Sequence, residues 1–309
     1  MAELRSFAKL NLGLEVTGRR ADGYHTLDTL FQTIDFFDKI DIVPNRSGRI
    51  EVFGSDPRIA WDETNTVSRA IHAVLDRYSL EEGFTVRVKK NIPPGAGLGG
   101  GSGNAAVILL YLNSYFGLDL SLAELTALAT AIGADVPFFL LGGTAHAQGI
   151  GDILSPAPPL GERWFALVTP PLEVPTGMVF SRLSLTNRAR AGTMTTFLET
   201  GDFSVLENHL EPVTFACFPQ IGQIKAQMAN LDLDMVLMSG SGATVFGLLR
   251  DRGQIPRVKD AIPGVRFCRS VGRAEYQERI GASPSGKASV FGADIRRFES
   301  SRPSTLHHG

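Results

Sequence analysis

The stretch Asn91-Ile-Pro-Pro-Gly-Ala-Gly-Leu-Gly-Gly-Gly-Ser-Gly-Asn104 decides the fold, because its glycine-rich loop joins two well-defined elements. Residues 84–90 before it alternate between apolar and polar side chains, which predicts a strand. Residues 105–116 after it are apolar over the length of a buried helix. Glycine lets backbone N–H groups turn toward one point, and a helix start adds unpaired donors and the positive end of a dipole. The sequence therefore predicts a phosphate-binding loop.

A dinucleotide-binding fingerprint and a flexible connection are the alternative interpretations of this loop. The glycine spacing matches the fingerprint, but Pro93 and Pro94 separate the glycines from the strand, where the fingerprint needs a tight turn. Residues 120–132 predict another helix, so the second strand with an acidic end does not follow. A flexible connection is disfavoured because the flanking elements are well defined.

The composition of the 309-residue chain is typical of a folded globular protein, with 43% hydrophobic and 20% charged residues. Its net charge of −2 argues against a nucleic-acid-binding surface over the whole chain. Cys217 and Cys268 have no CxxC or histidine pattern beside them, which argues against a zinc site and a disulfide scaffold. Apolar runs such as residues 136–141 are far too short to span a membrane. We expect a cytoplasmic monomer or homodimer with no nucleic-acid or membrane partner.

The order of predicted elements divides the chain into two domains and a tail. Residues 1–155 are rich in strands and contain the glycine loop, and the stiff segment Ser155-Pro-Ala-Pro-Pro159 predicts the boundary. Residues 156–272 alternate strands with helices, and residues 273–309 are polar and weakly periodic, which predicts a mobile tail. In the first domain we expect strands over 4–16, 26–35, 39–43 and 49–53, and helices over 65–78 and 121–132.

Three polar residues in apolar surroundings are candidates for a functional role. Lys9 and Asn11 share one face of the first predicted strand, and this pattern fits a solvated sheet edge equally well. Asp135 lies between the end of a helix and an apolar run, where an acid is unfavourable unless it accepts hydrogen bonds or serves chemistry. From the pattern alone, a turn-capping role is the favoured interpretation of Asp135.

Five motifs in order resemble known kinases. The motifs Ala8-Lys-Leu-Asn-Leu12, Pro93-Pro-Gly-Ala-Gly-Leu-Gly-Gly-Gly101 and Ser239-Gly-Ser-Gly-Ala-Thr-Val-Phe246 resemble the superfamily of galactokinase, homoserine kinase, mevalonate kinase and phosphomevalonate kinase. Within it, Arg19-Arg-Ala-Asp-Gly-Tyr-His25 and Gly133-Ala-Asp-Val-Pro-Phe-Phe139 are similar to the family of 4-diphosphocytidyl-2-C-methyl-D-erythritol kinases. The resemblance covers roughly residues 4–272.

This resemblance implies an α+β fold with two α/β domains. The N-terminal domain would be ribosomal-protein-S5-like and the C-terminal domain ferredoxin-like, with the active site in the cleft between them. The implied enzyme is a phosphotransferase that uses ATP and Mg²⁺ and acts on a small cytidine-diphosphate substrate. It would transfer the γ-phosphate to the 2-hydroxyl of 4-diphosphocytidyl-2-C-methyl-D-erythritol in the non-mevalonate synthesis of isoprenoid precursors.

The resemblance also carries roles to individual residues. Asp135 matches the catalytic aspartate that accepts or orients the proton of the attacking hydroxyl. Lys9 matches the catalytic lysine that keeps this acid ionised and offsets charge on the transferred phosphoryl group. Tyr24 and Phe180 would stack on the two faces of cytosine, and His25 would hydrogen-bond its edge.

Further contacts to both substrates follow from the same resemblance. Other substrate contacts are implied for Asn11, Thr176, Gly240 and Ser241. Contacts to ATP are implied for Asn65 near the adenine and, around the phosphates, for Pro93, Gly95, Gly97, Leu98, Gly99, Gly100, Gly101 and Ser102. The family usually has two serines after the glycines, whereas this chain has Ser102 followed by Gly103. The metal ligands are therefore unknown, with Ser102 as a possible one.

Two other functions are compatible with parts of this pattern. A sister kinase acting on homoserine or mevalonate would have no need of a base sandwich formed by Tyr24 and Phe180. A nucleotide-binding sensor that has lost catalysis would gain little from Lys9 and Asp135.

Overall fold

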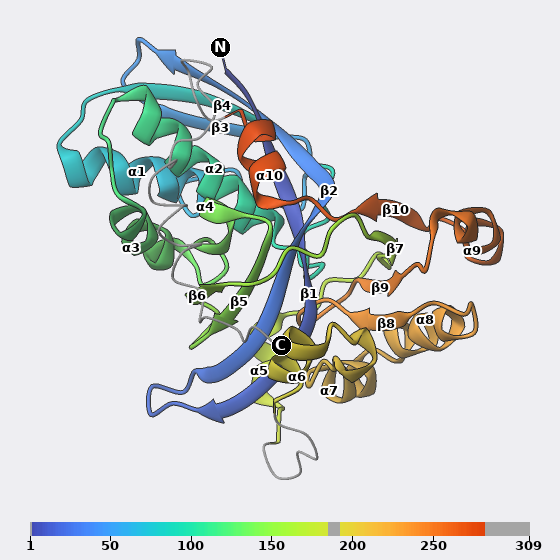
Figure 1. Cartoon of the computed structure of the whole chain (residues 1–309). Helices are drawn as coiled ribbons and strands as arrows, with labels where there is room; N and C mark the ends of the chain where they lie inside the picture. The colour runs from blue at the N-terminus through green and yellow to red at the C-terminus, as the bar shows by residue number, and fades with distance from the viewer. Residues whose placement is uncertain (1, 185–191, 282–309) are drawn as a thin grey trace, which may run out of the picture.

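The computed structural model describes residues 2–184 and 192–281 of the chain, which fold around two β-sheets (Figure 1). In this part of the chain, no helix has the length and apolar character needed to cross a membrane. The predicted domain boundary at residue 155 falls within the last strand of the first sheet, β6 (Ile153–Pro156), just before the connection to the second sheet, and stays a prediction.

Two long antiparallel strands form the spine of the molecule. They are β1 (Ala2–Arg19) and β2 (His25–Asn45). The register shifts at three places along the pair, and such bulges bend a strand and increase its twist. Because β2 is continuous, the prediction of separate strands over 26–35 and 39–43 was wrong.

The first sheet has the strand order β3-β4-β2-β5-β6, and β1 pairs with β2 off this path. Its remaining strands are β3 (Ile50–Gly54), β4 (Gly83–Lys89), β5 (Thr144–Gln148) and β6 (Ile153–Pro156). The helices that pack with it are α1 (Thr66–Tyr78), α2 (Gly100–Tyr115), α3 (Leu122–Ile132) and α4 (Phe138–Leu141). Helix starts follow local capping rules, since Asn65 caps α1 and Ser121 forms a capping box with Glu124 in α3.

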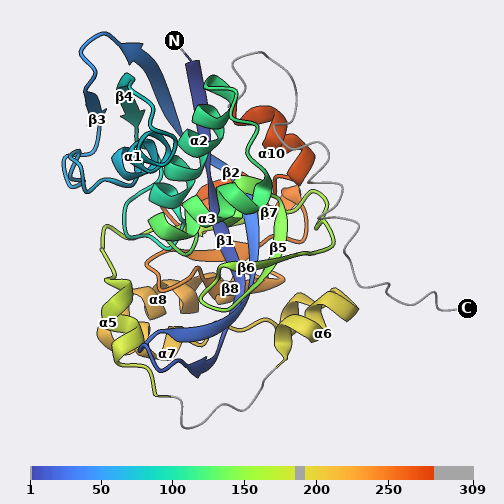
Figure 2. The same ribbon diagram turned by 90° about the vertical axis from the view of Figure 1, so that its left-hand side faces the viewer.

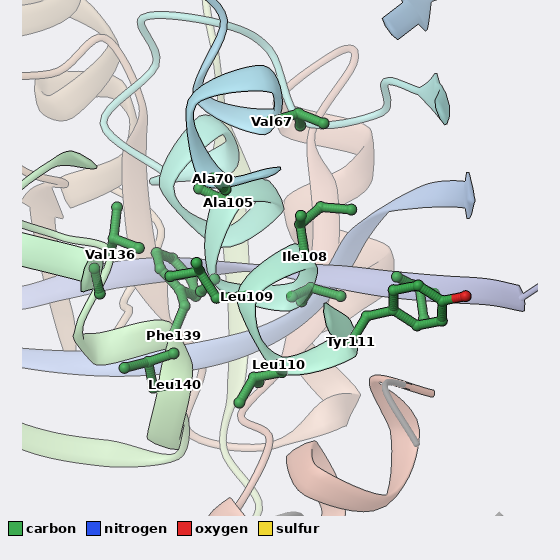
Figure 3. Packing of buried hydrophobic residues seen from close by; sticks show 14 of the residues in the cluster. Val67, Ala70, Ala105, Ile108, Leu109, Leu110, Tyr111, Val136, Phe139 and Leu140 are labelled. Carbon is green, nitrogen blue, oxygen red and sulfur yellow. The ribbon is translucent and has the colours of Figure 1, made fainter. Parts of the chain in front are cut away.

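Helix α2 is the centre of the first hydrophobic core. All of residues 103–113 are buried, which is expected of a helix that is apolar on every side. Figure 3 shows Ala105 and Leu109 of α2 between α1, which carries Ala70, and the segment that carries Val136 and Phe139. The helix begins at Gly100, five residues before the predicted start, so the last glycines of the loop form its first turn.

The second sheet is antiparallel throughout, with the order β10-β7-β9-β8. Its strands are β7 (Trp164–Val168), β8 (Met235–Met238), β9 (Val245–Leu248) and β10 (Arg266–Arg269). The helical segments here are α5 (Thr176–Ser181), α6 (Thr193–Thr200), η1 (Phe203–Val205), α7 (Glu211–Cys217), α8 (Pro219–Ala229), η2 (Arg252–Gln254) and α9 (Ile255–Ala261). Leu10 and Leu12 of β1 share a core with Phe165 and Phe246, so the two sheets are packed together.

A last helix, α10 (Arg273–Arg279), returns from the second sheet to the first core. Figures 1 and 2 both place it on the side of the molecule that carries α2. Tyr276 is fully buried and donates to the carbonyl of Phe139, while Gln277 donates to the carbonyls of Leu140 (2.9 Å) and Leu141 (3.0 Å). The prediction of a mobile tail was therefore wrong for α10, and residues 282–309 lie outside the described part.

We predict that α10 contributes substantially to stability. Replacing Tyr276 with Ala removes a buried ring and its hydrogen bond, and this should lower the free energy of unfolding by about 3–5 kcal/mol. Denaturant unfolding followed by circular dichroism measures the change. The control is Glu278→Ala at an exposed position of the same helix, which should change stability by no more than about 0.5 kcal/mol. Equal stabilities of the two variants would contradict the packing described here.

Candidate active site

A cleft of about 1080 Å³ lies where β1, β2, the glycine loop and the loops of the second sheet meet. It is lined by every residue that the sequence analysis singles out for catalysis or binding. They are Lys9, Asn11, Tyr24, His25, Asn65, Pro93, Gly95, Gly97, Leu98, Gly99, Gly100, Gly101, Ser102, Asp135, Thr176, Phe180, Gly240 and Ser241. The fold thus brings together residues that are up to about 230 positions apart in the chain.

Lys9 and Asp135 form an ion pair inside the cleft, with 3.3 Å between Lys9 Nζ and Asp135 Oδ2. The lysine side chain is only 4% exposed, whereas that of Asp135 is 34% exposed. Lys9 Nζ also lies 5.1 Å from the centre of the Phe31 ring, where a cation is attracted to the ring face. The pair therefore holds one enclosed ammonium beside one carboxylate that a ligand can reach.

Asn11 connects Lys9 to its surroundings. Its side-chain oxygen accepts from Lys9 Nζ, and its side-chain nitrogen donates to Thr29 Oγ1 at 2.9 Å. Its backbone N–H donates to Ser239 Oγ at 3.1 Å. Both Lys9 and Asn11 are buried, so the alternative of a solvated sheet edge is excluded.

Asp135 is placed by the turn between α3 and α4. Gly133 ends α3, and its carbonyl accepts from the backbone N–H of Val136 at 3.1 Å. Pro137 then stands directly before α4, where its fixed φ suits a helix start. The Asp135 side chain has its ion pair with Lys9, so the capping interpretation favoured by the sequence pattern alone does not account for its position.

The glycine loop has a conformation that other residues rarely adopt. Gly95, Gly97 and Gly99 have φ values of 63°, 75° and 69°. The backbone N–H of Lys9 donates to the carbonyl of Leu98 at 3.0 Å, which attaches the loop to β1. The first N–H groups of a helix have no acceptor within it, and Gly100, Gly101 and Ser102 of the first turn of α2 line the cleft. This arrangement suits an anion such as phosphate.

The loop between β8 and β9 closes the cleft from the second sheet. Ser239 Oγ donates to the carbonyl of Gly97 at 2.9 Å, and the backbone N–H of Thr244 donates to the carbonyl of Ala96 at 3.2 Å. A Cβ on Gly97 would overlap the carbonyl of Ser239, so only glycine allows this approach. Ser241 Oγ lies 2.8 Å from Thr176 Oγ1, which connects the loop to α5.

Three aromatic side chains, those of Tyr24, His25 and Phe180, line one part of the cleft. The rings of His25 and Phe180 lie 5.3 Å apart at an angle of 31°. Tyr24 precedes His25 and is 62% exposed, and its backbone N–H donates to Asp22 Oδ1 at 3.1 Å. The three rings thus come from the β1–β2 turn, the start of β2 and α5, and all three residues line the cleft.

The cleft also contains residues that the sequence analysis did not identify. Ile59, Trp61 and Lys90 line it together with the predicted Asn65. Asn65 caps α1 and donates to the carbonyl of Ala60 at 2.8 Å, so its side chain is held by backbone. The sequence pattern could have identified Lys90, because a positive charge stands there at the end of a predicted strand and next to the glycine loop. No comparable signal marked Trp61, because the loop before α1 has no regular period.

Gly103 does not face the phosphate side of the loop. A Cβ on this residue would lie 2.8 Å from Ser6 Oγ and 3.0 Å from the carbonyl of Phe7, both on β1. The missing side chain therefore lets α2 pack closely against β1. Ser102 lines the cleft instead, in the first turn of α2. Within the described residues, no group of three or more His, Cys, Asp or Glu side chains is arranged to hold a metal ion.

Comparisons with known proteins agree with this geometry. The family model for the N-terminal domain of GHMP kinases matches residues 65–143, and the model for their C-terminal domain matches residues 194–265. A 4-diphosphocytidyl-2-C-methyl-D-erythritol kinase from Syntrophotalea carbinolica is 42% identical over 79% of this chain and 88% of its own length. The enzyme of the same name from Shouchella clausii is 36% identical over 91% of this chain and 96% of its own length.

Solved structures show the same relationship. The crystal structure of a 4-(cytidine 5'-diphospho)-2C-methyl-D-erythritol kinase has a TM-score of 0.75 and 34% identity, and covers 87% of this chain and 99% of that one. A homoserine kinase from Cytophaga hutchinsonii shares the fold, with a TM-score of 0.70 and 19% identity over 88% of this chain and 95% of that one. The predicted two-domain α+β fold is confirmed. The chain belongs to the 4-diphosphocytidyl-2-C-methyl-D-erythritol kinase family of the GHMP kinases.

Proposed function

We propose that this chain transfers the γ-phosphate of ATP to the 2-hydroxyl of 4-diphosphocytidyl-2-C-methyl-D-erythritol, a step in the non-mevalonate synthesis of isoprenoid precursors. The observation that carries the proposal is the Lys9–Asp135 pair, which lies in one cleft with the glycine loop and the His25–Phe180 pair. A phosphate site, an acid beside an ammonium and an aromatic wall match the donor, the transfer step and the base of the acceptor. The relatives named for this activity support the same function.

In the proposed mechanism, Asp135 receives or orients the proton of the attacking hydroxyl. Its partly exposed carboxylate can reach a substrate, and Lys9 Nζ pairs with it at 3.3 Å. The new bond forms between the hydroxyl oxygen and the γ-phosphorus, and the bond from this phosphorus to the oxygen it shares with the β-phosphate breaks. The enclosed ammonium of Lys9 offsets negative charge on the group in transit.

The N–H groups of the glycine loop and of the first turn of α2 would hold the phosphates of ATP. We include Mg²⁺ in the proposal, with Ser102 as its protein ligand and with phosphate oxygens and water completing its shell. Mg²⁺ usually keeps several waters and needs few protein ligands, so a single hydroxyl on the cleft side fits this role. When bound, the ion would neutralise charge on the β- and γ-phosphates.

The part of the cleft that Tyr24, His25 and Phe180 line would bind the cytosine base. Phe180 and Tyr24 offer flat apolar surfaces for its two faces, and His25 offers ring nitrogens for its edge. Asn11, Thr176, Gly240 and Ser241 would contact the rest of the acceptor between this wall and Asp135.

We further propose that the protein acts in the cytoplasm as a monomer or homodimer, without a nucleic-acid or membrane partner. Light scattering after size-exclusion chromatography tests the assembly, and a larger oligomer would contradict it.

The decisive experiment is ADP release by the purified chain with ATP and Mg²⁺. The acceptors are 4-diphosphocytidyl-2-C-methyl-D-erythritol and, as controls, homoserine and mevalonate. Release with the cytidyl acceptor alone supports the proposal. Release with a control acceptor alone would favour a sister kinase, and no release despite measured ATP binding would favour a nucleotide-binding sensor.

We predict that Asp135→Asn abolishes turnover while ATP binding is retained. The amide keeps the shape of the side chain but cannot accept a proton, so kcat should fall by about 10²–10⁴-fold. Steady-state kinetics and a calorimetric titration with ATP measure the two effects. Turnover within about twofold of the original chain would remove Asp135 from its proposed role.

We predict that Tyr24→Ala weakens binding of the cytidyl substrate. Loss of one stacking partner should raise its KM by about 5- to 150-fold, since base–aromatic stacking is worth about 1–3 kcal/mol. The KM for ATP should stay the same. A matched control is Phe53→Ala, which removes another exposed ring from β3, outside the cleft. An unchanged KM for the cytidyl substrate in Tyr24→Ala would argue against the base sandwich.

A further inference from the structure

A buried carboxylate lies beneath the glycine loop and takes no part in the mechanism above. Asp38 belongs to β2 and is fully buried. Its Oδ1 atom accepts from the backbone N–H groups of Asn91 at 2.7 Å and Ile92 at 2.9 Å. These two residues lead from β4 into the glycines. Asp38 therefore attaches the strand side of the loop to β2.

The other oxygen of Asp38 reaches the helix side of the loop. With its amide nitrogen directed at acceptors, Asn104 of α2 has this two-hydrogen donor within hydrogen-bond distance of Asp38 Oδ2 (3.1 Å), Ser6 Oγ (2.7 Å) and the carbonyl oxygen of Gly100 (2.9 Å). Ser6 is a fully buried residue of β1. The absence of a side chain on Gly103 brings this part of α2 close to Ser6. One carboxylate thus links both ends of the glycine loop to the β1–β2 spine.

Lys90 supplies the positive charge that balances the carboxylate of Asp38 in this buried position. Its ammonium pairs with Asp38 Oδ2, and the side chains of the two residues are only 4% and 0% exposed. Lys90 Nζ lies 3.1 Å from the position that a Cβ on Gly100 would occupy, at the positive end of the α2 dipole. An ammonium there would be unfavourable without a carboxylate beside it. The pair therefore places a neutralised charge directly under the first turn of α2.

We propose that Asp38 and Asn104 are positioning residues that hold the glycine loop in its phosphate-binding conformation before the nucleotide binds. The inference rests on the proposed function, because it takes ATP as the ligand of the loop. Glycines lose more conformational freedom on ordering than other residues, so an unattached loop of this composition would bind phosphate at an entropic cost. Attachment at both ends removes most of that cost in advance.

The main test is the isosteric change Asp38→Asn. The amide oxygen can still accept from Asn91 and Ile92, but the amide nitrogen then faces two donors, Lys90 and Asn104. We expect the Kd for ATP to rise by about tenfold or more. The Kd for the cytidyl acceptor should stay within about twofold, because its proposed wall is formed by other elements, the β1–β2 turn, the start of β2 and α5. Both constants are measured by calorimetry at a temperature at which the melting curves show folded protein.

The matched control is Asp28→Asn on the same strand. Asp28 is also a largely enclosed carboxylate, with a side chain 15% exposed, and its basic partner is His146 of β5. This variant should bind ATP within about twofold of the original chain. It separates the loss of a partly buried carboxylate on β2 from the loss of the loop attachment.

Asn104→Ala is the second variant, and it tests whether loop attachment affects ATP binding if Asp38→Asn does not fold. It removes only the helix-side attachment and changes no charge, so the Kd for ATP should rise by about threefold or more. ATP affinity within about twofold in the folded variants, together with lowered melting temperatures, would overturn the proposal and leave a purely structural network. If the original chain binds no ATP, the proposed function itself fails, and the inference fails with it.

Discussion

The close contact between two glycine loops is the constraint on which the active site depends. Gly97 lies in the loop that follows β4 of the first sheet, and Ser239 lies in the loop that follows β8 of the second sheet. A side chain at position 97 would overlap the Ser239 carbonyl. The Ser239 hydroxyl accepts from the backbone of Asn11 and donates to the carbonyl of Gly97. A single hydroxyl therefore contacts both β1 and the glycine loop that follows β4, and the cleft exists because the two loops can meet here.

Lys9 and Lys90 are two lysines of the cleft whose side chains are buried, and each is paired with an aspartate. The two aspartates differ in solvent exposure, and this difference suggests different roles for the two pairs. Lys9 is paired with Asp135, whose carboxylate is partly exposed and open to a ligand. Lys90 is paired with Asp38, which is fully buried and hydrogen-bonded by backbone. An acid that exchanges a proton with substrate must be reachable, whereas an acid that fixes a loop is most effective where water cannot compete. The same type of lysine–aspartate pair is thus suited to proton transfer at Asp135 and to fixing the loop at Asp38.

Local patterns predicted the elements that form through local interactions. The glycine loop, the helix capped by Asn65 and the capping box at Ser121 all depend on residues within a few positions of each other. Helix α10 was missed, because a seven-residue segment with many charges has little intrinsic stability. The buried Tyr276 of α10 and Ile280 directly after it are stabilised by contacts with α4 and β1.

The sequence alone determined the glycine loop and the family, and it predicted the residues that would carry the chemistry, because glycine spacing and short motifs are local properties. Only the tertiary structure decided between a solvated edge and an enclosed site for Lys9, and it alone revealed Asp38 as a partner of the loop. Residue 38 is more than fifty positions from Asn91, and Lys9 is more than a hundred from Asp135. Burial and hydrogen-bond partners at such separations depend on how strands and helices pack, and packing is a property of the whole chain.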